Sequence, residues 1–455
     1  MLEVIILAAG RGSRMHSDLP KVLHTLAGKP MLAHVMETAT ALSADRVHLV
    51  VGHGADQVKA VFADQADCHL QEQQLGTGHA VQQALPHCDP ASTVLVLYGD
   101  VPLMSATTLS SLIAEAKTSP ALLTARLDDP TGYGRVIRDQ QGELVCVVEQ
   151  KDASAEQKRI NEVNTGVLAA PADLLADLLA GVDNSNAQGE YYLPDILALS
   201  RGRGLPVPII VTDDVIETQG VNDRAQLEQL ERAFQGRLAE DLMRDGVTLL
   251  DRCRIDVRGD LQCGRDVTID ANVLFEGRVS LADGVSIGAN CVIKDANLGS
   301  GTVIRPFSHI DGAVIGANCT IGPYARLRPD TRLGDAVRIG NFVETKKTTL
   351  GAGSKANHLA YLGDSTLGES CNVGAGTITC NYDGANKHPT ILGDDVFIGS
   401  NSTLVAPLTL AGGTFVAAGS TVTRATDADQ LAVARARQRN IDGWKKPSKS
   451  PKVEE

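Results

Sequence analysis

The sequence predicts two different domains joined by a helix: an α/β domain with a Rossmann-like, mostly parallel sheet, then a parallel β-helix of hexapeptide repeats. Three patterns predict this. Apolar runs alternate with helix-like stretches in the first half, an amphipathic stretch follows, and the second half repeats every six residues. At 455 residues the chain is too long for one core. We expect domains at residues 1–222 and 247–455, with the linker helix at 223–246.

In the first half, short apolar runs rich in Val and Leu are separated by helical patterns. The expected strands are Val4–Ala8, Val47–Val51, Val94–Tyr98, Leu122–Arg126, Leu144–Val148, Val163–Leu168 and Pro208–Val211. The expected helices include Pro30–Leu42, Asp56–Phe62 and Thr107–Ala116. Strands that alternate with helices indicate a mostly parallel sheet covered on both faces, with ligands at the carboxyl ends of its strands.

The linker has apolar residues at steps of three or four, which is the spacing of an amphipathic helix. These residues are Leu227, Leu230, Phe234, Leu238 and Leu242. Asn222 or Asp223 can cap the helix and Gly246 can end it. A helix that docks on the β-helix is favoured, and a surface helix of the first domain is the alternative.

In the second half, one apolar residue recurs every six positions, in three separate runs. These runs are Ile269, Phe275, Leu281, Ile287, Ile293; Ile315, Ile321, Leu327, Leu333, Ile339; and Leu392, Ile398, Leu404, Leu410, Val416, Val422. Ordinary strands repeat every two residues and helices every 3.6, so neither explains the spacing. Three hexads per turn of a triangular prism do, and they allow about ten coils.

The repeat is interrupted at residues 344–366 and at 379–389. A solenoid tolerates extra residues as a loop that leaves one corner, and such loops often carry function. We therefore expect two projecting loops, the first containing His358 and the second containing the sequence NYDG.

The composition of the chain indicates what kind of molecule it binds and in which cellular compartment it lies. The net charge of −13 argues against nucleic acid. Nine scattered cysteines without a CxxC motif indicate reduced thiols. The apolar run near the N-terminus is too short for a signal peptide or a membrane span. We expect a cytoplasmic protein with no membrane insertion.

The first strand leads into LAAGRGSRMHSDLPK, a Gly-rich turn that carries Arg11, Arg14 and Lys21. Glycines let backbone N–H groups approach phosphate, and the cations neutralise its charge. No GK[ST] follows, so this is not a P-loop, and Met15 replaces the third glycine of a dinucleotide fingerprint. A tight structural turn is the alternative. Asp100 follows another strand in VLYGD and could hold Mg²⁺, or it could be an ordinary turn aspartate.

This turn, together with QLGTGHA, YGD, GYGR, VEQKD, NTG and GVND in that order, resembles the sugar-nucleotide pyrophosphorylases. With the hexads and both interruptions, the chain resembles the bacterial bifunctional N-acetylglucosamine-1-phosphate uridyltransferases/glucosamine-1-phosphate acetyltransferases from about residue 4 to about 445. The resemblance implies a left-handed β-helix and a homotrimer formed through it.

For the first domain, the resemblance implies Mg²⁺-dependent uridylyl transfer from UTP to N-acetylglucosamine-1-phosphate, which releases pyrophosphate. Arg14 and Lys21 would be catalytic, and Asp100 and Asn222 would hold Mg²⁺. The implied UTP and UDP-sugar site consists of Leu7, Ala8, Ala9, Gly10, Lys21, Gln71, Gly76, Thr77, Tyr98, Gly99, Asp100, Gly134, Glu149, Asn164 and Asn222. The product would feed peptidoglycan and lipopolysaccharide synthesis.

For the second domain, the resemblance implies transfer of an acetyl group from acetyl-CoA to the amine of glucosamine-1-phosphate. His358 would be the general base, although a loop histidine alone is usually a surface residue. The implied sugar-phosphate site is Arg328, Lys346, Tyr361 and Asn372. The implied acetyl-CoA site is Ala375, Asn381, Tyr382, Ser400, Ala418 and Arg435, where Tyr382 could instead anchor its loop and Arg435 could be a solvated tail residue.

Two other functions fit parts of the sequence. The first is a single-activity pyrophosphorylase whose prism serves assembly, which leaves His358 and NYDG unexplained. The second is a regulatory subunit with a degenerate nucleotide site, which leaves Arg14, Lys21, Asp100 and Asn222 unexplained.

Overall fold

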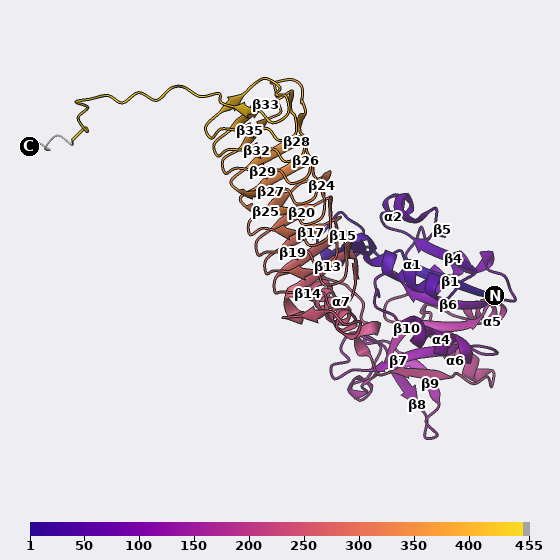
Figure 1. Cartoon of the computed structure of the whole chain (residues 1–455). Helices are drawn as coiled ribbons and strands as arrows, with labels where there is room; N and C mark the ends of the chain where they lie inside the picture. Colours follow the sequence, from indigo (N-terminus) through magenta and orange to yellow (C-terminus); the bar gives the residue numbers. More distant parts are fainter. Residues whose placement is uncertain (449–455) are drawn as a thin grey trace, which may run out of the picture. The chain divides into compact units, whose positions relative to one another are not determined.

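The computed structural model describes residues 1–448 and contains two compact units (Figure 1). The first comprises Met1–Glu240 with Val257–Gly259, and the second comprises the remainder of the described chain. The division falls within one long helix, α7 (Arg224–Arg244). Within residues 1–448, no helix is both long enough and apolar enough to cross a membrane.

The first unit is built on a nine-stranded sheet whose main path runs β11-β7-β10-β6-β1-β4-β5, with β8 and β9 beside β10. Its strands are β1 (Leu2–Ala8), β4 (Arg46–Val51), β5 (Asp67–Leu70), β6 (Thr93–Tyr98), β7 (Ala121–Arg126), β8 (Arg135–Arg138), β9 (Leu144–Val148), β10 (Glu162–Pro171) and β11 (Ile209–Thr212), with a separate hairpin of β2 (Thr25–Leu26) and β3 (Lys29–Pro30). Its helices before α7 are α1 (Met31–Ala41), α2 (Ala55–Phe62), α3 (Thr77–Ala84), α4 (Ala106–Glu115), α5 (Ala172–Leu179) and α6 (Asp195–Gly202).

The mostly parallel sheet predicted from the sequence is confirmed. β1 pairs in parallel with both β4 and β6, whereas β10 runs antiparallel to β6 and β7. All seven expected strands are present, and β5 and β8 were missed. Both missed strands carry polar residues, DCHL and RVIR, so neither forms the apolar run that identifies a buried strand.

Alternate residues of β1 supply two separate cores, one on each face of the sheet. Val4 and Ile6 pack with residues from α1, α2 and α4. Ile5 and Leu7 pack with residues from α3, α5 and α6. The strand has a near-continuous apolar sequence because both of its faces are covered.

The connections change direction at β1. Helices α1 and α2 lead through β4 to β5 on one side of β1, and α3 then returns the chain to β6 on its other side. Because α3 lies on the opposite face from α1 and α2, a crevice opens at the carboxyl ends of β1 and β6. This is the topological switch point, where open α/β sheets bind their ligands.

Helix α7 occupies the segment where the linker helix was predicted. The Asp223 carboxylate accepts the Gln226 amide proton at 2.9 Å, which caps the helix, and Gly246 has φ +94° just past its end. The apolar residue Leu230 is buried against the first unit, and Phe234 packs beside it. These contacts agree with the alternative, a surface helix of the first domain. Further along the helix, Gln235 exchanges two hydrogen bonds with the Val257 backbone, at 2.8 and 2.9 Å, and docking on the β-helix stays a prediction.

In the second unit, short parallel strands stack in three columns, as expected for the three faces of a prism (Figure 1). The first column is β12 (Thr248–Leu249), β14 (Thr268–Ile269), β16 (Ser286–Ile287), β19 (Val303–Ile304), β22 (Thr320–Ile321), β25 (Arg338–Asn341), β27 (Lys355–His358), β29 (Asn372–Val373), β32 (Phe397–Ile398), β35 (Phe415–Val416) and β37 (Leu431–Ala432).

The other two columns share the long strands β13 (Ile255–Cys263), β15 (Val273–Leu281), β26 (Glu344–Leu350) and β28 (Tyr361–Leu367). One also contains β17 (Val292–Lys294), β20 (His309–Asp311), β23 (Arg326–Leu327), β30 (Ile378–Cys380), β33 (Thr403–Val405) and β36 (Thr421–Val422). The other contains β18 (Asn297–Leu298), β21 (Ala313–Ile315), β24 (Thr331–Leu333), β31 (Thr390–Leu392) and β34 (Leu408–Leu410).

Every apolar residue of the predicted hexad runs is buried, at most 4% exposed. Each stacks on its equivalent in the next coil: Ile269 pairs with Ile287, and Ile321 pairs with Ile339. The hexad prediction is thus confirmed as one inward side chain per face.

The projecting loop predicted at residues 344–366 does not exist. This stretch forms β26, β27 and β28, which continue the columns without an insertion. The inward positions are Thr345 and Ala356, both fully buried, and the step from Thr345 to Leu350 has five residues instead of six. Because the inward residues here are small or polar and the spacing shortens, a search for large apolar residues every six positions misses the repeat. His358 therefore lies at the end of β27 and not in a loop.

The interruption at 379–389 is a real insertion. Val373 pairs with Ile398 twenty-five residues later, whereas Ile398 pairs with Val416 after eighteen. The extra residues form a small hairpin closed by a bridge between Tyr382 and Lys387.

Truncating an inward residue should destabilise the coils far more than truncating its outward neighbour. Ile304 is fully buried and Val303 is 38% exposed on the same strand. We expect Ile304→Ala to lower the free energy of unfolding by about 2–5 kcal/mol because it leaves a cavity. Val303→Ala should cost under about 1 kcal/mol. Urea unfolding followed by circular dichroism measures both, and equal losses would contradict the one-inward-residue arrangement.

Candidate functional site

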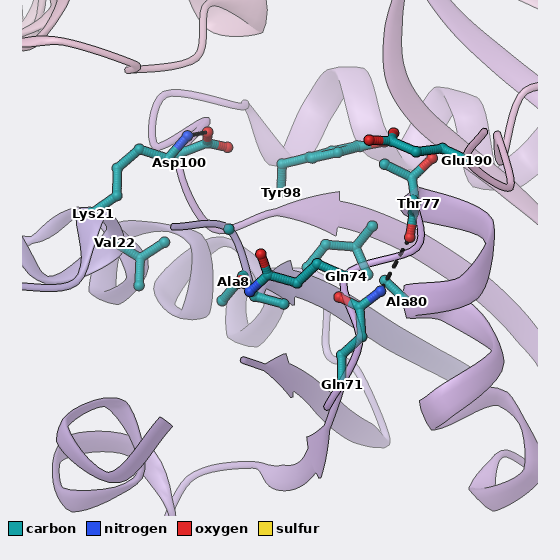
Figure 2. A pocket seen from close by; sticks show the side chains of 14 residues that line it. Ala8, Lys21, Val22, Gln71, Gln74, Thr77, Ala80, Tyr98, Asp100 and Glu190 are labelled. Atoms are coloured by element: carbon teal, nitrogen blue, oxygen red, sulfur yellow. Dashed lines mark hydrogen bonds and ion pairs between the residues drawn. The ribbon is translucent and has the colours of Figure 1, made fainter. Parts of the chain in front are cut away.

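A pocket of about 240 Å³ opens at the switch point of the first unit (Figure 2). Ten of the residues predicted to bind nucleotide line it, together with four that were not predicted. The predicted ones are Leu7, Ala8, Ala9, Gly10, Lys21, Gln71, Gly76, Thr77, Tyr98 and Asp100, and the others are Val22, Gln74, Ala80 and Glu190. Gly99 lies just behind them, where its N–H donates to the Leu7 carbonyl at 2.9 Å.

Lys21 is held at one end of this pocket by two oxygen atoms that accept from its ammonium. Its ammonium forms an ion pair with the Asp100 carboxylate (Figure 2). The same ammonium donates to Asn222 Oδ1 at 3.3 Å. Gly12 adopts φ +59°, and a Cβ there would lie 2.7 Å from Lys21 Cβ, so glycine lets the turn close over the lysine stem. Arg14 is exposed on the adjoining 3-10 helix (Ser13–Met15) and does not line the pocket.

The arrangement around Lys21 tests whether Asp100 and Asn222 could share a metal ion. Carboxylate and amide oxygens are the donors that Mg²⁺ prefers, and two protein oxygens are a common number for it. Both oxygens already reach one positive group, the Lys21 ammonium. The donor set and its convergence therefore fit a divalent cation.

The floor of the pocket is fixed by the loop Gln71–Thr77. Gln71 Nε2 donates to the Gly76 carbonyl at 3.1 Å, and the Thr77 hydroxyl accepts the Leu193 amide proton at 3.0 Å. Gly76 has φ +109°, and a Cβ there would lie 2.6 Å from the Tyr191 carbonyl oxygen. Any side chain at residue 76 would push these two loops apart.

Two polar residues of the pocket were missed by the sequence analysis. Gln74 Nε2 donates to the Ala9 carbonyl at 2.7 Å, so it braces the turn after β1. Its position within the polar loop QEQQLGTG was a usable signal. Glu190 comes from a loop far along the chain, and no motif marks it.

Gly134, Glu149 and Asn164 form a neighbouring group next to the pocket. The Asn164 N–H donates to the Gly134 carbonyl at 2.9 Å, and a Cβ on Gly134 would lie 2.9 Å from Glu149 Oε1. Burial, with the charges of Asp195 and Asp152, raises the pKa of Glu149. Burial, with the nearby Glu149 and Asp100 carboxylates, raises the pKa of Tyr98, so its phenol stays protonated. The pKa of Tyr98 therefore depends on a carboxylate of the pocket, Asp100, and on one of the neighbouring group, Glu149.

In the second unit, His358 is exposed and its ring is oriented by one hydrogen bond. His358 Nδ1 lies 2.8 Å from Asn341 Oδ1, which belongs to the previous coil. An amide oxygen can only accept, so the Nδ1 atom carries a proton, and in the neutral ring Nε2 keeps its lone pair. This tautomer presents a proton acceptor to solvent.

The same corner of successive coils carries the residues predicted for acetyl-CoA. Ala356, Val373, Ile398 and Val416 are register partners in consecutive coils. The residues two positions beyond them therefore form one line, which we call the corner line: Asn341, His358, Ala375, Ser400 and Ala418. Arg435 Nη1 donates to the Ala418 carbonyl at 2.7 Å, which places this arginine at the end of the line.

Cations gather on the adjoining strands. Arg328 Nη1 forms an ion pair with Glu344 at 3.0 Å. The pKa of Lys346 is lowered, chiefly by its side-chain contact with Lys387, and the charge of Arg328 adds to this. Lys387, which the sequence analysis missed, lies in the hairpin of the insertion. Positive side chains brought this close together favour an anion between them.

The remaining predicted residues surround this cluster of cations. A Cβ on Gly363 would lie 2.4 Å from the Tyr361 hydroxyl and 2.7 Å from Asn381 Nδ2, so these two side chains meet over the glycine. Asn372 stands in β29, beside β27, on the first column. Tyr382 is 59% exposed, and its hydroxyl donates to the Gly384 carbonyl at 2.6 Å within its own hairpin.

Comparison with known proteins finds relatives along the whole chain. Residues 4–189 match the MobA-like NTP transferase domain, and residues 257–341 match the GMPPB C-terminal domain. A protein of Marinobacter nauticus named "Bifunctional protein GlmU" is 56% identical over 451 residues, which is 99% of this chain and 99% of that protein. One of the same name from an Azoarcus species is 56% identical over 98% of this chain and 100% of its own length.

Among solved structures, a nucleotidyl transferase from Methanothermobacter thermautotroptrophicus is similar over 51% of this chain and 97% of its own. Its sequence identity is 19% and its TM-score is 0.37, a level that says nothing about activity.

The acidic group beside the pocket should make stability depend on pH. Burial, with the charges of Asp183 and Asp152, raises the pKa of Asp195 to about 6, whereas an unfolded aspartate titrates near about 3.9. The stabilising contribution of the protonated form is therefore present at low pH and is lost as pH rises through about 6. As pH is raised from 4.5 to 7.5, the free energy of unfolding of Asp195→Asn should therefore increase relative to that of the native protein. We expect this relative gain to be on the order of 1 kcal/mol after solvent screening.

Thermal unfolding at both pH values measures this difference. Asp173→Asn is the matched control, because Asp173 also lies in the first turn of a helix. If both variants change in parallel with pH, the effect does not belong to Asp195.

Proposed function

The chain belongs to the family of bifunctional GlmU proteins, and from this membership we propose that it makes UDP-N-acetylglucosamine in two steps, N-acetylation of glucosamine-1-phosphate and then uridylyl transfer. The first unit acts as the uridyltransferase and the second as the acetyltransferase. Two observations support this division: the pocket with Lys21 at the switch point and the oriented His358 on the corner line. The two sites lie in different units.

In the uridylyl transfer, a phosphate oxygen of N-acetylglucosamine-1-phosphate attacks the α-phosphorus of UTP. The bond to the departing pyrophosphate breaks, and UDP-N-acetylglucosamine forms. A phosphate monoester is already nucleophilic, so the protein must mainly offset negative charge. Lys21 supplies charge at the α-phosphate once it leaves Asp100, and Arg14, free in solvent on the adjoining turn, can close on the leaving group.

Asp100 and Asn222 would hold Mg²⁺, which supplies further positive charge to the phosphates when bound. The turn from Leu7 to Gly10 receives the nucleotide with Gln71, Gly76 and Thr77. Gly134, Glu149 and Asn164 hold the sugar. Glu149 accepts hydrogen bonds from its hydroxyls, and the lack of a side chain at Gly134 lets Glu149 lie close against the backbone there.

In the acetyl transfer, the amine of glucosamine-1-phosphate attacks the thioester carbonyl of acetyl-CoA. His358 Nε2 takes the proton that the amine loses, and the CoA sulfur departs with the bonding electrons. The hydrogen bond to Asn341 is the observation that carries this role, because it fixes the tautomer that a base requires. As the imidazolium forms, the Asn341 oxygen stabilises its charge.

The cations Arg328 and Lys346 bind the phosphate of the sugar, with Lys387 beside them. Tyr361 and Asn372 contact the sugar. Acetyl-CoA lies along the corner line, where Ala375, Ser400 and Ala418 leave room, and Arg435 meets a CoA phosphate. Asn381 and Tyr382 extend from the hairpin toward the same ligand. We propose that the coils associate as a homotrimer, so that a second subunit completes this site.

The domain assignment follows from the same proposal. Residues 1–222 suffice for uridylyl transfer, residues 247–455 carry acetyl transfer, and 223–246 connect them. A single-activity pyrophosphorylase is the rival function. It assigns no role to the oriented His358 or to the cations around Lys346.

Removing the base should separate the two activities. His358→Ala should lower acetyl transfer by about 10²–10⁴-fold and leave uridylyl transfer near normal. Release of free CoA thiol measures the first reaction and release of pyrophosphate the second. His309→Ala is the control, because His309 is also exposed on a coil strand and has no proposed role. Loss of both activities, or of neither, would contradict the division.

Removing the metal ligand should give the reverse result. Asp100→Ala should reduce uridylyl transfer by at least about 10²-fold because it removes a carboxylate that fixes the cation. Acetyl transfer should be unchanged. Asp64→Ala, which removes an exposed carboxylate of the same unit, should affect neither reaction. An Asp100→Ala enzyme with native Mg²⁺ dependence of pyrophosphate release would show that Asp100 holds no metal.

A further inference from the structure

A second cluster of metal-binding side chains lies in the first unit, away from the pocket. Glu3 stands at the start of β1, His48 on β4, and Cys88 just before β6. The pocket is formed at the opposite, carboxyl ends of β1 and β6. Neither proposed reaction uses this cluster. Among residues 1–448 it is the only group of three or more such residues whose donor atoms all lie within 4.8 Å of one another.

All three side chains are inside the protein. Glu3 and His48 are 0% exposed and Cys88 is 8% exposed. His48 Nε2 lies 2.7 Å from Glu3 Oε2. Burying ionisable groups costs free energy unless they are paired or bind a metal. The cluster offers one carboxylate oxygen, one imidazole nitrogen and one sulfur.

We propose that Glu3, His48 and Cys88 form a binding site for one divalent transition-metal ion of the zinc type. Thiolate and imidazole donors select zinc-like ions over Mg²⁺ or Ca²⁺. Around a tetrahedral ion, ligands about 2.0–2.3 Å from the ion lie about 3.3–3.8 Å from one another. The donor atoms all lie within 4.8 Å of one another, so they reach this spacing with shifts of up to about 1 Å.

Charge also favours this donor set. Cysteine binds such an ion as a thiolate, so Cys88 must lose its thiol proton. Binding exchanges the thiol proton for the ion, and one proton leaves to solvent. A divalent cation with one thiolate and one carboxylate is then electrically neutral, which suits a buried position.

His69 and His87 form the layer behind the site. His48 Nδ1 lies 3.1 Å from His69 Nε2, and the rings of His69 and His87 stack at 4.6 Å. A neutral His69 can accept the proton of His48 Nδ1, which leaves Nε2 free for the ion. Metal-binding histidines are usually oriented in this way.

Without an ion the same atoms can satisfy one another. Glu3 accepts from the Asp89 amide at 2.8 Å as well as from His48. Metal binding must replace the bond between Glu3 and His48 by two bonds to the ion. The competing outcome is therefore a hydrogen-bonded cluster only.

Cobalt provides a direct test, because a Co²⁺–thiolate bond absorbs near the ultraviolet and a tetrahedral Co²⁺ absorbs in the visible. Metal-stripped, full-length protein is titrated with Co²⁺, and Zn²⁺ is then added. We expect one thiolate-bound Co²⁺ per chain, release of one proton, and loss of the bands when Zn²⁺ displaces it. Absence of a thiolate band would overturn the proposal.

Variants assign the signal to this cluster. Cys88→Ser should abolish the thiolate band, whereas Cys146→Ser, which alters another partly buried thiol of the same unit, should retain it. His69→Gln should weaken Co²⁺ binding by about 10–100-fold. A band that survives in Cys88→Ser overturns the proposal. If Cys88→Ser fails to fold, anomalous scattering from zinc-soaked crystals of the native protein decides, and a map without a peak bonded to Glu3, His48 and Cys88 overturns it.

Discussion

The stacking of one inward side chain on its equivalent in the next coil is the constraint on which the second unit depends. Each inward residue must meet its partner, as Ile398 meets Val416, so the coils cannot slip. Outward residues are then aligned as strictly as the core. The corner line is a consequence: His358 stands beside Asn341 because Ala356 stacks on Ile339. His358 is not part of the core, yet the core residues beneath it determine its orientation.

The first unit also aligns its site residues through its backbone, but it does so with a parallel sheet. Parallel strands bring their carboxyl ends to one edge, and the reversal of the connections at β1 leaves that edge open. Lys21, Asp100 and Asn222 come from three distant parts of the chain, yet they meet there. The contact also restrains Lys21, because an ammonium paired with a carboxylate is not free to bind phosphate. In the proposed reaction, Asp100 and Asn222 would hold Mg²⁺ and Lys21 would be available to the phosphate.

Apolar periodicity predicted seven strands of the first unit and the hexads of the second, because it reports burial directly. The resemblance to a known family, and not periodicity, predicted most of the pocket residues. These patterns failed where the buried residue is polar or small. Thr345 and Ala356 fill inward positions without interrupting the coil, so a loop was expected where a strand exists. Lys387 and Glu190 were missed because only tertiary structure brings them to their sites. The orientation of His358 depends on a hydrogen bond, which no spacing reveals.

The mistaken loop changes how the second site should be understood. With His358 on a regular strand, its position is set by coils that are rigid and close-packed, and general bases benefit from such support. The one true insertion, residues 379–389, carries Lys387 and Tyr382 and lies outside the regular coils. The proposed base thus lies on a strand of the coils, whereas some of the proposed substrate contacts lie on a hairpin. In the proposed acetyl transfer, the strand fixes the orientation of His358, and the hairpin adds Lys387 to the cations beside it.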